Sequence, residues 1–435
     1  MVEIFRNSEY MKTIKYPLKN DWSELLKRPS FNSAVLESVV KSVLIDVKQN
    51  GDAAIKKYTK QFDKVELESL LVSEEEFADA EKNVSIELKQ AIQLAKSNIE
   101  KFHNAQKEDV KVVETTDGVS CWRKSVAIEK VGLYIPGGSA PLFSTVLMLG
   151  VPAFLAGCKE ILLCSPPGVN GKINPAILYT AKLVGITKVF KVGGAQAIAA
   201  MAYGTETISK VYKIFGPGNQ YVTCAKQLVN MEGVAIDMPA GPSELAILAD
   251  ESCIPAFVAA DLLSQAEHGI DSQVILVSTD EQVVKNVVIE LNRQVELLPR
   301  KAIAIKALEN SKAILLKDTN EAFDLLNEYA PEHLIIACMD EEVLAEKVIN
   351  AGSVFLGNYS CESAGDYASG TNHTLPTNGN AKAYSGVSLD SFFKKITFQK
   401  ISEKGINNIG NAIEIMAEAE GLDAHKNAVC VRLKK

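Results

Sequence analysis

The 435-residue sequence lacks the spaced cysteines of a zinc finger or a thiol redox motif. Its eight cysteines include no Cys-x-x-Cys pair. We therefore expect reduced, mostly buried thiols rather than a disulfide framework or a cysteine-bound metal, as is typical of a cytoplasmic protein.

Long apolar runs and blocks of basic residues are also absent. The most apolar stretch, TVLMLGVPAFLAG, is interrupted by Gly150 and Pro152, and no run reaches the roughly 18 residues of a membrane helix. The N-terminal residues contain no apolar core with a cleavage site. Acidic and basic residues are interspersed at a net charge of −8, without a basic patch for nucleic acid. We expect a small-molecule ligand and neither a membrane nor a nucleic-acid partner.

The N-terminal part is predicted to be helical scaffold that follows an initial segment, residues 1–30. Apolar residues recur with helical spacing from Phe31 to about Gln106. The sequence SEEE at 73–76 fits the capping box that opens a helix.

Two series of strand-like segments follow and alternate with helical segments. The first series includes EILLCSP and KVFKVGG, and the second includes LAILAD, SQVILVST and HLIIAC. This alternation is typical of parallel sheets covered by helices. We predict two doubly wound α/β domains, one formed by residues 126–242 and the other by residues 31–125 plus 243–383, with the first helices packed on the second sheet.

A polar helical tail, without strands, is predicted for residues 384–435. It carries Glu420 and His425 in a sequence with little reason to bury itself in a separate globule. We expect the tail to reach across a partner subunit.

Three glycine-rich turns follow predicted strands, at residues 134–145, 192–200 and 215–226. The last two lead directly into helices, whose N-terminal N–H groups favour phosphate. None has the G-x-G-x-x-G pattern; the turn at 216 begins G-P-G, but Tyr221 stands where its third glycine would be. Ordinary turns and a nucleotide site without the usual fingerprint both stay open, since crevices at strand ends are frequent ligand sites.

Four of the five histidines lie after residue 260 in polar or small-residue surroundings: His268, His333, His373 and His425. His103, in EKFHNAQ, is interpreted as a solvated helix residue. Each histidine alone could have a structural role. Four of them in one half of the chain, together with Glu332 and Asp366, favour a functional site.

A candidate metal site begins with SQAEHG at 264–269, where Gln265 and His268 would project from one helix face. With Asp366 and His425 they would form a nitrogen and oxygen set without thiolate, compatible with Zn²⁺, Mn²⁺ or Co²⁺ and with room for substrate. Spacing does not establish this set. An amide bonded to helix ends and a turn cap are the alternatives for Gln265 and Asp366.

Glu332 and His333 follow Pro331 at a predicted strand entrance. One of them could act as acid or base while the other polarises water. The alternative is a proline-led strand entry with two exposed polar residues.

Nine segments, in order, resemble the histidinol dehydrogenase family from about residue 126 to the C-terminus, and the helical N-terminal part fits by length and position. They are YIPGGSAPLFSTVLM, GGAQAIAAMAYGT, GPGNQYVTCAK, DMPAGPSE, LLSQAEHG, YAPEHL, AGSVFLG, GDYASGTNHTLPT and EGLDAHKNAV.

The resemblance implies a homodimer in which each subunit has two incomplete Rossmann-like domains and an extended tail. It implies oxidation of L-histidinol through L-histidinal to L-histidine, the final step of histidine biosynthesis, with two NAD⁺ reduced. A dehydrogenase for another amino alcohol or a sulfonate, and a binding module without turnover, are the alternatives. The intact PEHL and EGLDAHKNA segments disfavour the first alternative, and intact Glu332 and His333 disfavour the second.

The resemblance also assigns roles in chemistry to individual residues. One zinc ion per subunit would be held by Gln265, His268, Asp366 and, from the other subunit, His425. His333 would take the alcohol proton, and Glu332 would activate water for the aldehyde step.

Further residues are assigned to the ligands by the same resemblance. The histidinol site would comprise His333, the four metal ligands, and Ser243, Tyr367 and Glu420. The NAD site in the 126–242 domain would comprise Tyr134, Gln196 and Asn219. His373 could also face the substrate.

Overall fold

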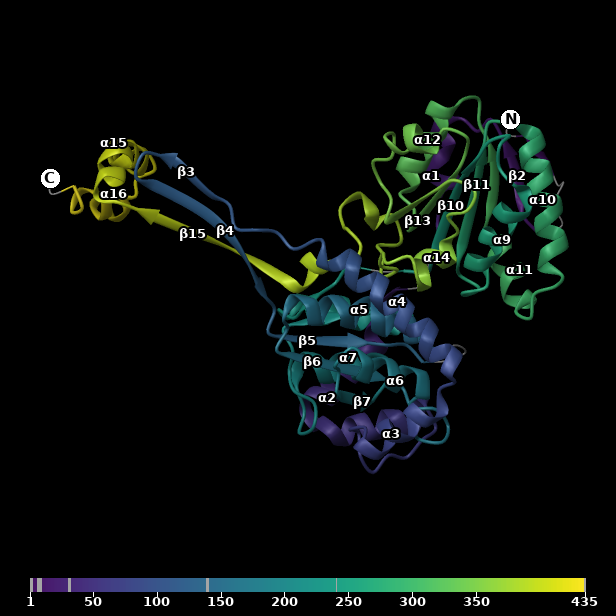
Figure 1. The fold of residues 1–435 in the computed structure, drawn as a ribbon, viewed down its shortest axis with the longest axis horizontal. Helices are drawn as coiled ribbons and strands as arrows, with labels where there is room; N and C mark the ends of the chain where they lie inside the picture. Colours follow the sequence, from purple (N-terminus) through teal and green to yellow (C-terminus); the bar gives the residue numbers. More distant parts are fainter. Residues whose placement is uncertain (1–2, 6–9, 30–32, 138–140, 240, 434–435) are drawn as a thin grey trace.

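The computed structural model describes residues 3–5, 10–29, 33–137, 141–239 and 241–433. Figure 1 shows two α/β lobes side by side and a long arm that extends away from both. We name the lobes by their sheets, the five-stranded lobe and the seven-stranded lobe. Within the described ranges, no helix combines the length and apolar character needed to cross a bilayer.

The five-stranded lobe contains a parallel sheet of order β7-β6-β5-β8-β9. Its strands are β5 (Lys130–Tyr134), β6 (Glu160–Ser165), β7 (Lys188–Lys191), β8 (Lys213–Phe215) and β9 (Ala235–Ile236). The helices between them are α5 (Phe143–Ala156), α6 (Pro175–Leu183), α7 (Gly194–Tyr203) and α8 (Gln220–Met231). The alternating pattern predicted for residues 126–242 is therefore present.

The N-terminal helices cover this same sheet, not the second one, so their predicted packing was wrong. They are α2 (Ser33–Phe62), α3 (Glu74–Asn83) and α4 (Ile86–Asn104). Ile55 of α2 shares a hydrophobic cluster with Leu162 of β6. Ile92 of α4 shares another with Leu163, which points to the opposite face of the sheet. An apolar stripe shows that a helix packs on something, but does not identify the sheet.

The predicted capping box at the start of α3 is confirmed. The Ser73 N–H donates to Glu76 Oε2 at 2.9 Å, and the Glu76 N–H donates to Ser73 Oγ at 3.3 Å.

The seven-stranded lobe has the strand order β1-β2-β12-β11-β10-β13-β14, and every neighbouring pair is parallel except β1 and β2. Its strands are β1 (Glu3–Phe5), β2 (Lys12–Lys15), β10 (Glu244–Ala249), β11 (Gln273–Ser278), β12 (Lys312–Leu315), β13 (His333–Ala337) and β14 (Ser353–Leu356). The described part of residues 1–30, predicted as a separate segment, thus contributes two strands to this sheet.

Helices cover both faces of the seven-stranded sheet. They are α1 (Trp22–Leu25), α9 (Pro255–Ala266), α10 (Glu281–Val295), α11 (Lys301–Glu309), α12 (Thr319–Tyr329), α13 (Glu341–Ala345) and α14 (Glu362–Tyr367), with 3-10 turns η1 (Lys19–Asp21) and η2 (Asn380–Lys382). Leu245 and Ala246, adjacent on β10, belong to separate hydrophobic clusters on the two sides. The sheet therefore has a core on each face, as a doubly wound fold requires.

The arm consists of β3 (Val112–Thr116), β4 (Val119–Ala127), β15 (Phe393–Ile401), α15 (Glu403–Ala419) and α16 (Asp423–Cys430). Its strands form an antiparallel sheet of order β15-β4-β3. The prediction that residues after 384 contain no strand was wrong. The partner of β15 lies in a distant part of the sequence, so local patterning gave no sign of the pairing.

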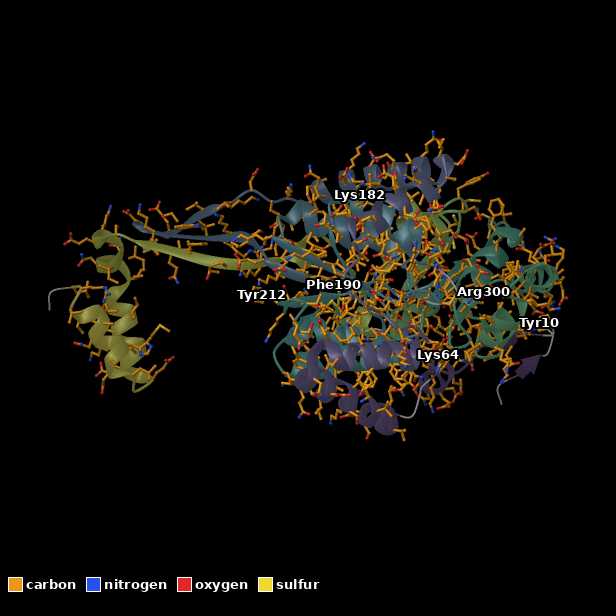
Figure 2. All side chains as sticks on the ribbon, turned by 90° about the horizontal axis from the view of Figure 1, so that it is seen from below. Tyr10, Lys64, Lys182, Phe190, Tyr212 and Arg300 are labelled. Atoms are coloured by element: carbon orange, nitrogen blue, oxygen red, sulfur yellow. The ribbon has the colours of Figure 1, made fainter. Side chains whose placement is uncertain are left out.

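The base of the arm is anchored in the five-stranded lobe. Phe392, at the end of the 3-10 turn η3 (Leu389–Phe392), is fully buried and stacks on Phe215 with 4.2 Å between ring centroids. The Ile128 N–H donates to the Phe392 carbonyl at 2.9 Å. Beyond this point the arm projects on its own, and Figure 2 shows its side chains pointing outward on both sides.

Candidate functional site

A cavity of about 1410 Å³ is lined by residues of both lobes, among them four of the predicted site residues, Asn219, Ser243, His268 and Glu332. Gly216 and Asn219 line it from the five-stranded lobe, and Ser243, His268 and Glu332 from the seven-stranded lobe. Glu332 and Ser243 directly precede β13 and β10, so these candidate site residues lie at the amino ends of the two strands.

Glu332 and His333 are held at the start of β13 by the main chain of one residue on β10. The Glu244 N–H donates to Glu332 Oε2 at 2.9 Å, and His333 Nδ1 lies 3.2 Å from the Glu244 carbonyl oxygen. A carbonyl only accepts, so this contact assigns the proton to Nδ1. His333 is 4% exposed and Glu332 is also buried, which excludes the alternative of two exposed polar residues at a strand entry.

The ring nitrogen His333 Nε2 is left available for another group. It is buried and has no hydrogen-bond partner among the described residues. Asp366 Oδ1 is 3.8 Å away, which is too long for a hydrogen bond. Burial lowers the pKa of His333 to about 3, because the charged imidazolium is poorly solvated there. The structure thus provides a neutral imidazole whose Nε2 lone pair is free to accept a proton or a hydrogen bond.

The Glu332 carboxyl is also strongly perturbed by its surroundings. Burial raises its pKa well above the ordinary range, and the nearby carboxylates of Glu244 and Asp366 raise it further. The hydrogen bond from the Glu244 N–H opposes that rise. A carboxyl with a raised pKa is the stronger base once it has lost its proton.

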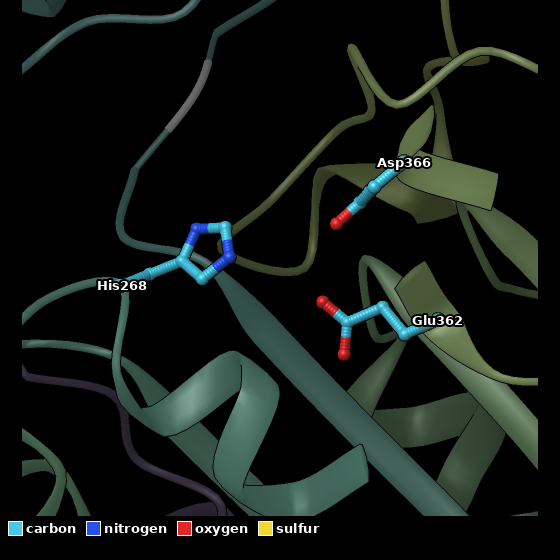
Figure 3. A group of neighbouring side chains, drawn as sticks. All are labelled: His268, Glu362 and Asp366. Atoms are coloured by element: carbon cyan, nitrogen blue, oxygen red, sulfur yellow. The ribbon is translucent and has the colours of Figure 1, made fainter. Parts of the chain in front are cut away.

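Three side chains converge on a point suited to a metal ion: His268, Glu362 and Asp366. One ligand atom from each lies within 4.8 Å of the others, and Figure 3 shows their polar ends directed toward one another. Burial raises the pKa of Asp366 to about 7 and that of Glu362 well above its ordinary range. The buried carboxyl of Glu362 and the partly buried carboxyl of Asp366, beside an imidazole, fit a divalent cation, which would offset their desolvation.

Gln265 adjoins this cluster from α9 and is completely buried. Its amide reaches both oxygens of Glu362 when its nitrogen faces that carboxylate. The prediction that Gln265 and His268 share a helix was only partly right. The helix ends at Ala266, so His268 lies in the turn beyond it and is exposed.

Glu362 was missed by the sequence analysis. It is the first residue of α14 and stands four positions before Asp366, so the two carboxylates share a helix face. That spacing was the available signal, but two carboxylates four residues apart do not by themselves indicate a bound cation.

His425 and Glu420 are not brought to this cluster within the chain. Both are exposed near α16 at the outer end of the arm, far from the two lobes in Figure 1. Tyr367, adjacent to Asp366 at the end of α14, is 53% exposed.

The three residues predicted for the NAD site lie around two glycine-rich turns. Asn219 caps α8, where its side chain accepts from the Tyr221 and Val222 N–H groups at 3.0 and 3.2 Å. Tyr134 and Gln196 are buried, and the Gly194 N–H donates to the Tyr134 hydroxyl at 3.1 Å. Residues 138–140, in the remaining turn at 134–145, lie outside the described residues.

Two further histidines have clear structural partners. His373 Nδ1 donates to the Asp366 carbonyl at 2.9 Å, and Thr145 of α5 contacts His373 Nε2 at 3.1 Å, so His373 bridges the two lobes. His103, predicted to be solvated, is fully buried and pairs with Gln106 at 3.2 Å.

Comparisons with known proteins identify one family over nearly the whole chain. The family model described as histidinol dehydrogenase matches residues 26–433. The curated histidinol dehydrogenase of Bacteroides fragilis is 63% identical over 425 residues, which cover 98% of this chain and 99% of the relative. That of Bacteroides thetaiotaomicron is 64% identical over 423 residues, or 97% and 99% of the two chains. A crystal structure of histidinol dehydrogenase from Elizabethkingia anophelis is similar with a TM-score of 0.96 and 60% identity, covering 98% of each chain.

Proposed function

The chain belongs to the histidinol dehydrogenase family, enzymes of histidine biosynthesis, and on that premise we propose that it oxidises L-histidinol through L-histidinal to L-histidine while two NAD⁺ are reduced. The observation that carries the proposal is the free Nε2 of His333, which lies 3.8 Å from Asp366 in the candidate metal cluster. The candidate base, His333, therefore lies beside the candidate metal cluster that would hold the substrate.

His333 acts first, as the base for the alcohol. Its Nδ1 proton is held by the Glu244 carbonyl, so Nε2 faces the substrate with its lone pair. This nitrogen takes the hydroxyl proton while hydride leaves the substrate carbon. Burial favours the neutral ring, so the base is ready before substrate binds.

Glu332 acts in the second oxidation. An aldehyde must add water before a second hydride can leave, and the water needs a base. Glu332 lines the cavity and adjoins His333, with 3.8 Å between Glu332 Oε2 and His333 Nδ1. Its carboxylate takes the water proton, and its raised pKa makes it the stronger base for this step.

Gln265, His268 and Asp366 would hold one zinc ion, with His425 of the partner subunit as a further ligand. The nitrogen and oxygen donors fit a zinc site that keeps positions open for substrate. Bound zinc would hold the substrate's amine and imidazole and fix the reacting carbon. Ser243 and Tyr367 from this chain, and the partner's Glu420, would complete the histidinol site.

NAD would bind on the five-stranded lobe at the side that faces the cavity. Asn219 lines that cavity at the N-terminus of α8, where N–H groups favour a pyrophosphate. Tyr134 and Gln196 would support the same site through the turn at Gly194. We further propose that the enzyme is a cytoplasmic homodimer, in which each arm completes the partner's site.

The test of this function is the number of NADH molecules formed per L-histidinol, measured at completion with excess NAD⁺ and Zn²⁺ and again after chelation. Two NADH, lost on chelation and restored by Zn²⁺, are expected. One NADH would mean that the aldehyde is released and that Glu332 does not activate water. No NADH from folded, zinc-loaded protein would refute the proposed substrate.

A further inference from the structure

Glu362 is a buried carboxylate to which the proposed reaction gives no role. It is 1% exposed, and its carboxylate lies within the His268, Glu362 and Asp366 cluster. Two readings of this position are possible: Glu362 binds the cation directly, or it acts on a residue that does. The contacts of its two oxygens favour the second.

Both carboxylate oxygens of Glu362 are engaged by α9. The Gln265 amide nitrogen, when turned toward Glu362, donates to Oε1 in a short contact and to Oε2 at 3.3 Å. Ser264 Oγ donates to Oε2 at 3.4 Å. His333 Nδ1 is 3.9 Å from Oε1, too far for a hydrogen bond, and already contacts the Glu244 carbonyl.

The orientation of the Gln265 amide determines what this side chain can offer a cation. An amide binds a metal ion through its oxygen and never through its nitrogen, which has no free lone pair. The nitrogen must then point at an acceptor, since an unpaired buried N–H group is costly. Glu362 supplies that acceptor, and the opposite orientation would set the amide oxygen against a carboxylate.

We propose that Glu362 is a positioning residue that holds the Gln265 amide nitrogen and thereby turns the amide oxygen toward the cation position between His268 and Asp366. The inference rests on the proposed role of Gln265 as a zinc ligand. Because Glu362 and Asp366 share α14, the same contact joins the two helices that carry Gln265 and Asp366.

The experiment is a double-substitution cycle read out as the zinc dissociation constant, measured by chelator competition without substrate. Glu362→Met removes the acceptor at similar volume, and we expect about 10–100-fold weaker zinc binding, as is usual for loss of a group that orients a ligand. Glu362→Gln keeps an acceptor oxygen for the Gln265 amide, so most of the affinity should return. The melting temperature of each metal-free variant checks folding.

The Gln265→Met background separates the two roles. If Glu362 acts through Gln265, adding Glu362→Met to Gln265→Met should weaken zinc binding less than twofold further. A full further loss, or equal losses for Glu362→Gln and Glu362→Met, would make Glu362 a direct ligand and overturn the proposal. Unchanged affinity in Glu362→Met would overturn it as well. Unchanged affinity in Gln265→Met would instead refute the ligand set on which the proposal rests.

Discussion

Replacing Arg28 with methionine should destabilise the seven-stranded lobe, because it leaves the buried Glu244 carboxylate without its counter-charge. Its guanidinium donates to Glu244 from Nε at 2.5 Å and from Nη2 at 2.9 Å, and Nη2 also donates to the Tyr329 carbonyl at 2.6 Å. The arginine side chain is 16% exposed and that of Glu244 is 3% exposed. Arg28 thus neutralises the side chain of Glu244, the residue whose main chain holds Glu332 and His333.

The size of the effect follows from what the substitution leaves behind. Without Arg28, the Glu244 carboxylate keeps a hydrogen bond from the Asn378 N–H at 2.6 Å but has no counter-charge. Loss of one partner from a buried ion pair costs about 3–5 kcal/mol of unfolding free energy. The matched control, Arg293→Met, breaks an exposed pair with Glu290 and should cost much less than Arg28→Met, because water solvates the charge that is left behind.

The destabilisation should also depend on pH. Burial raises the pKa of Glu244 in the folded state, and the hydrogen bond and charge of Arg28 oppose that rise. A carboxyl with a raised folded pKa contributes stability below its unfolded pKa, and this contribution is lost as the pH rises through the folded pKa. Arg28→Met raises the folded pKa further. Its cost should therefore be smaller at about pH 5, where Glu244 can take up a proton, than at about pH 8.

Urea unfolding followed by Trp22 fluorescence measures this effect. Trp22 is buried in the same hydrophobic cluster as Tyr329, and the other tryptophan, Trp122, lies on the arm and can be replaced by phenylalanine. A cost below about 1 kcal/mol for Arg28→Met, or an equal cost at both pH values, would refute the reasoning.

Two predictions concern the chemistry. His333→Asn should lower turnover about 10²–10⁴-fold, because it removes the nitrogen that takes the alcohol proton. The zinc content, measured by atomic absorption, should stay unchanged. Wild-type turnover in this variant would exclude the role of His333. His425→Asn and Gln265→Ala chains should each be inactive alone, yet regain activity when dissociated and reassociated together, because one site of each mixed dimer is then complete. Absence of activity in mixed dimers verified by mass spectrometry would show that the site is formed within one chain.

The sequence predicted the elements of the fold better than their packing. The alternation of strands and helices in both lobes could be predicted because each element has its own apolar period. The sheet to which Ile55 and Ile92 contribute could not, because it depends on surfaces that local patterning does not describe. Strand β15 was missed for a related reason, since it pairs along its whole length with β4, far earlier in the chain.

In the candidate site, too, some residues could be predicted from the sequence and others depend on tertiary contacts. Three residues given by the family resemblance, Glu332, His333 and Asp366, lie close together, whereas His425 and Glu420 lie on the arm. The supporting residues were not predicted. Arg28 acts by pairing with Glu244, and Glu362 by its contact with Gln265, and neither pairing leaves a local signature. His103 was mistaken for a solvated residue because its burial depends on tertiary packing.

The attachment of Glu332 and His333 to Glu244 has a consequence for mutagenesis and for sequence divergence. Both contacts come from the peptide groups of one residue, so no side chain at position 244 encodes them. What encodes them is the alignment of β10 with β13, in which Leu245 stands opposite His333. Replacing Glu244 with alanine would therefore leave both main-chain groups in place. A one-residue insertion between Glu244 and Leu245 would move the Glu244 peptide groups out of that alignment and remove both contacts together.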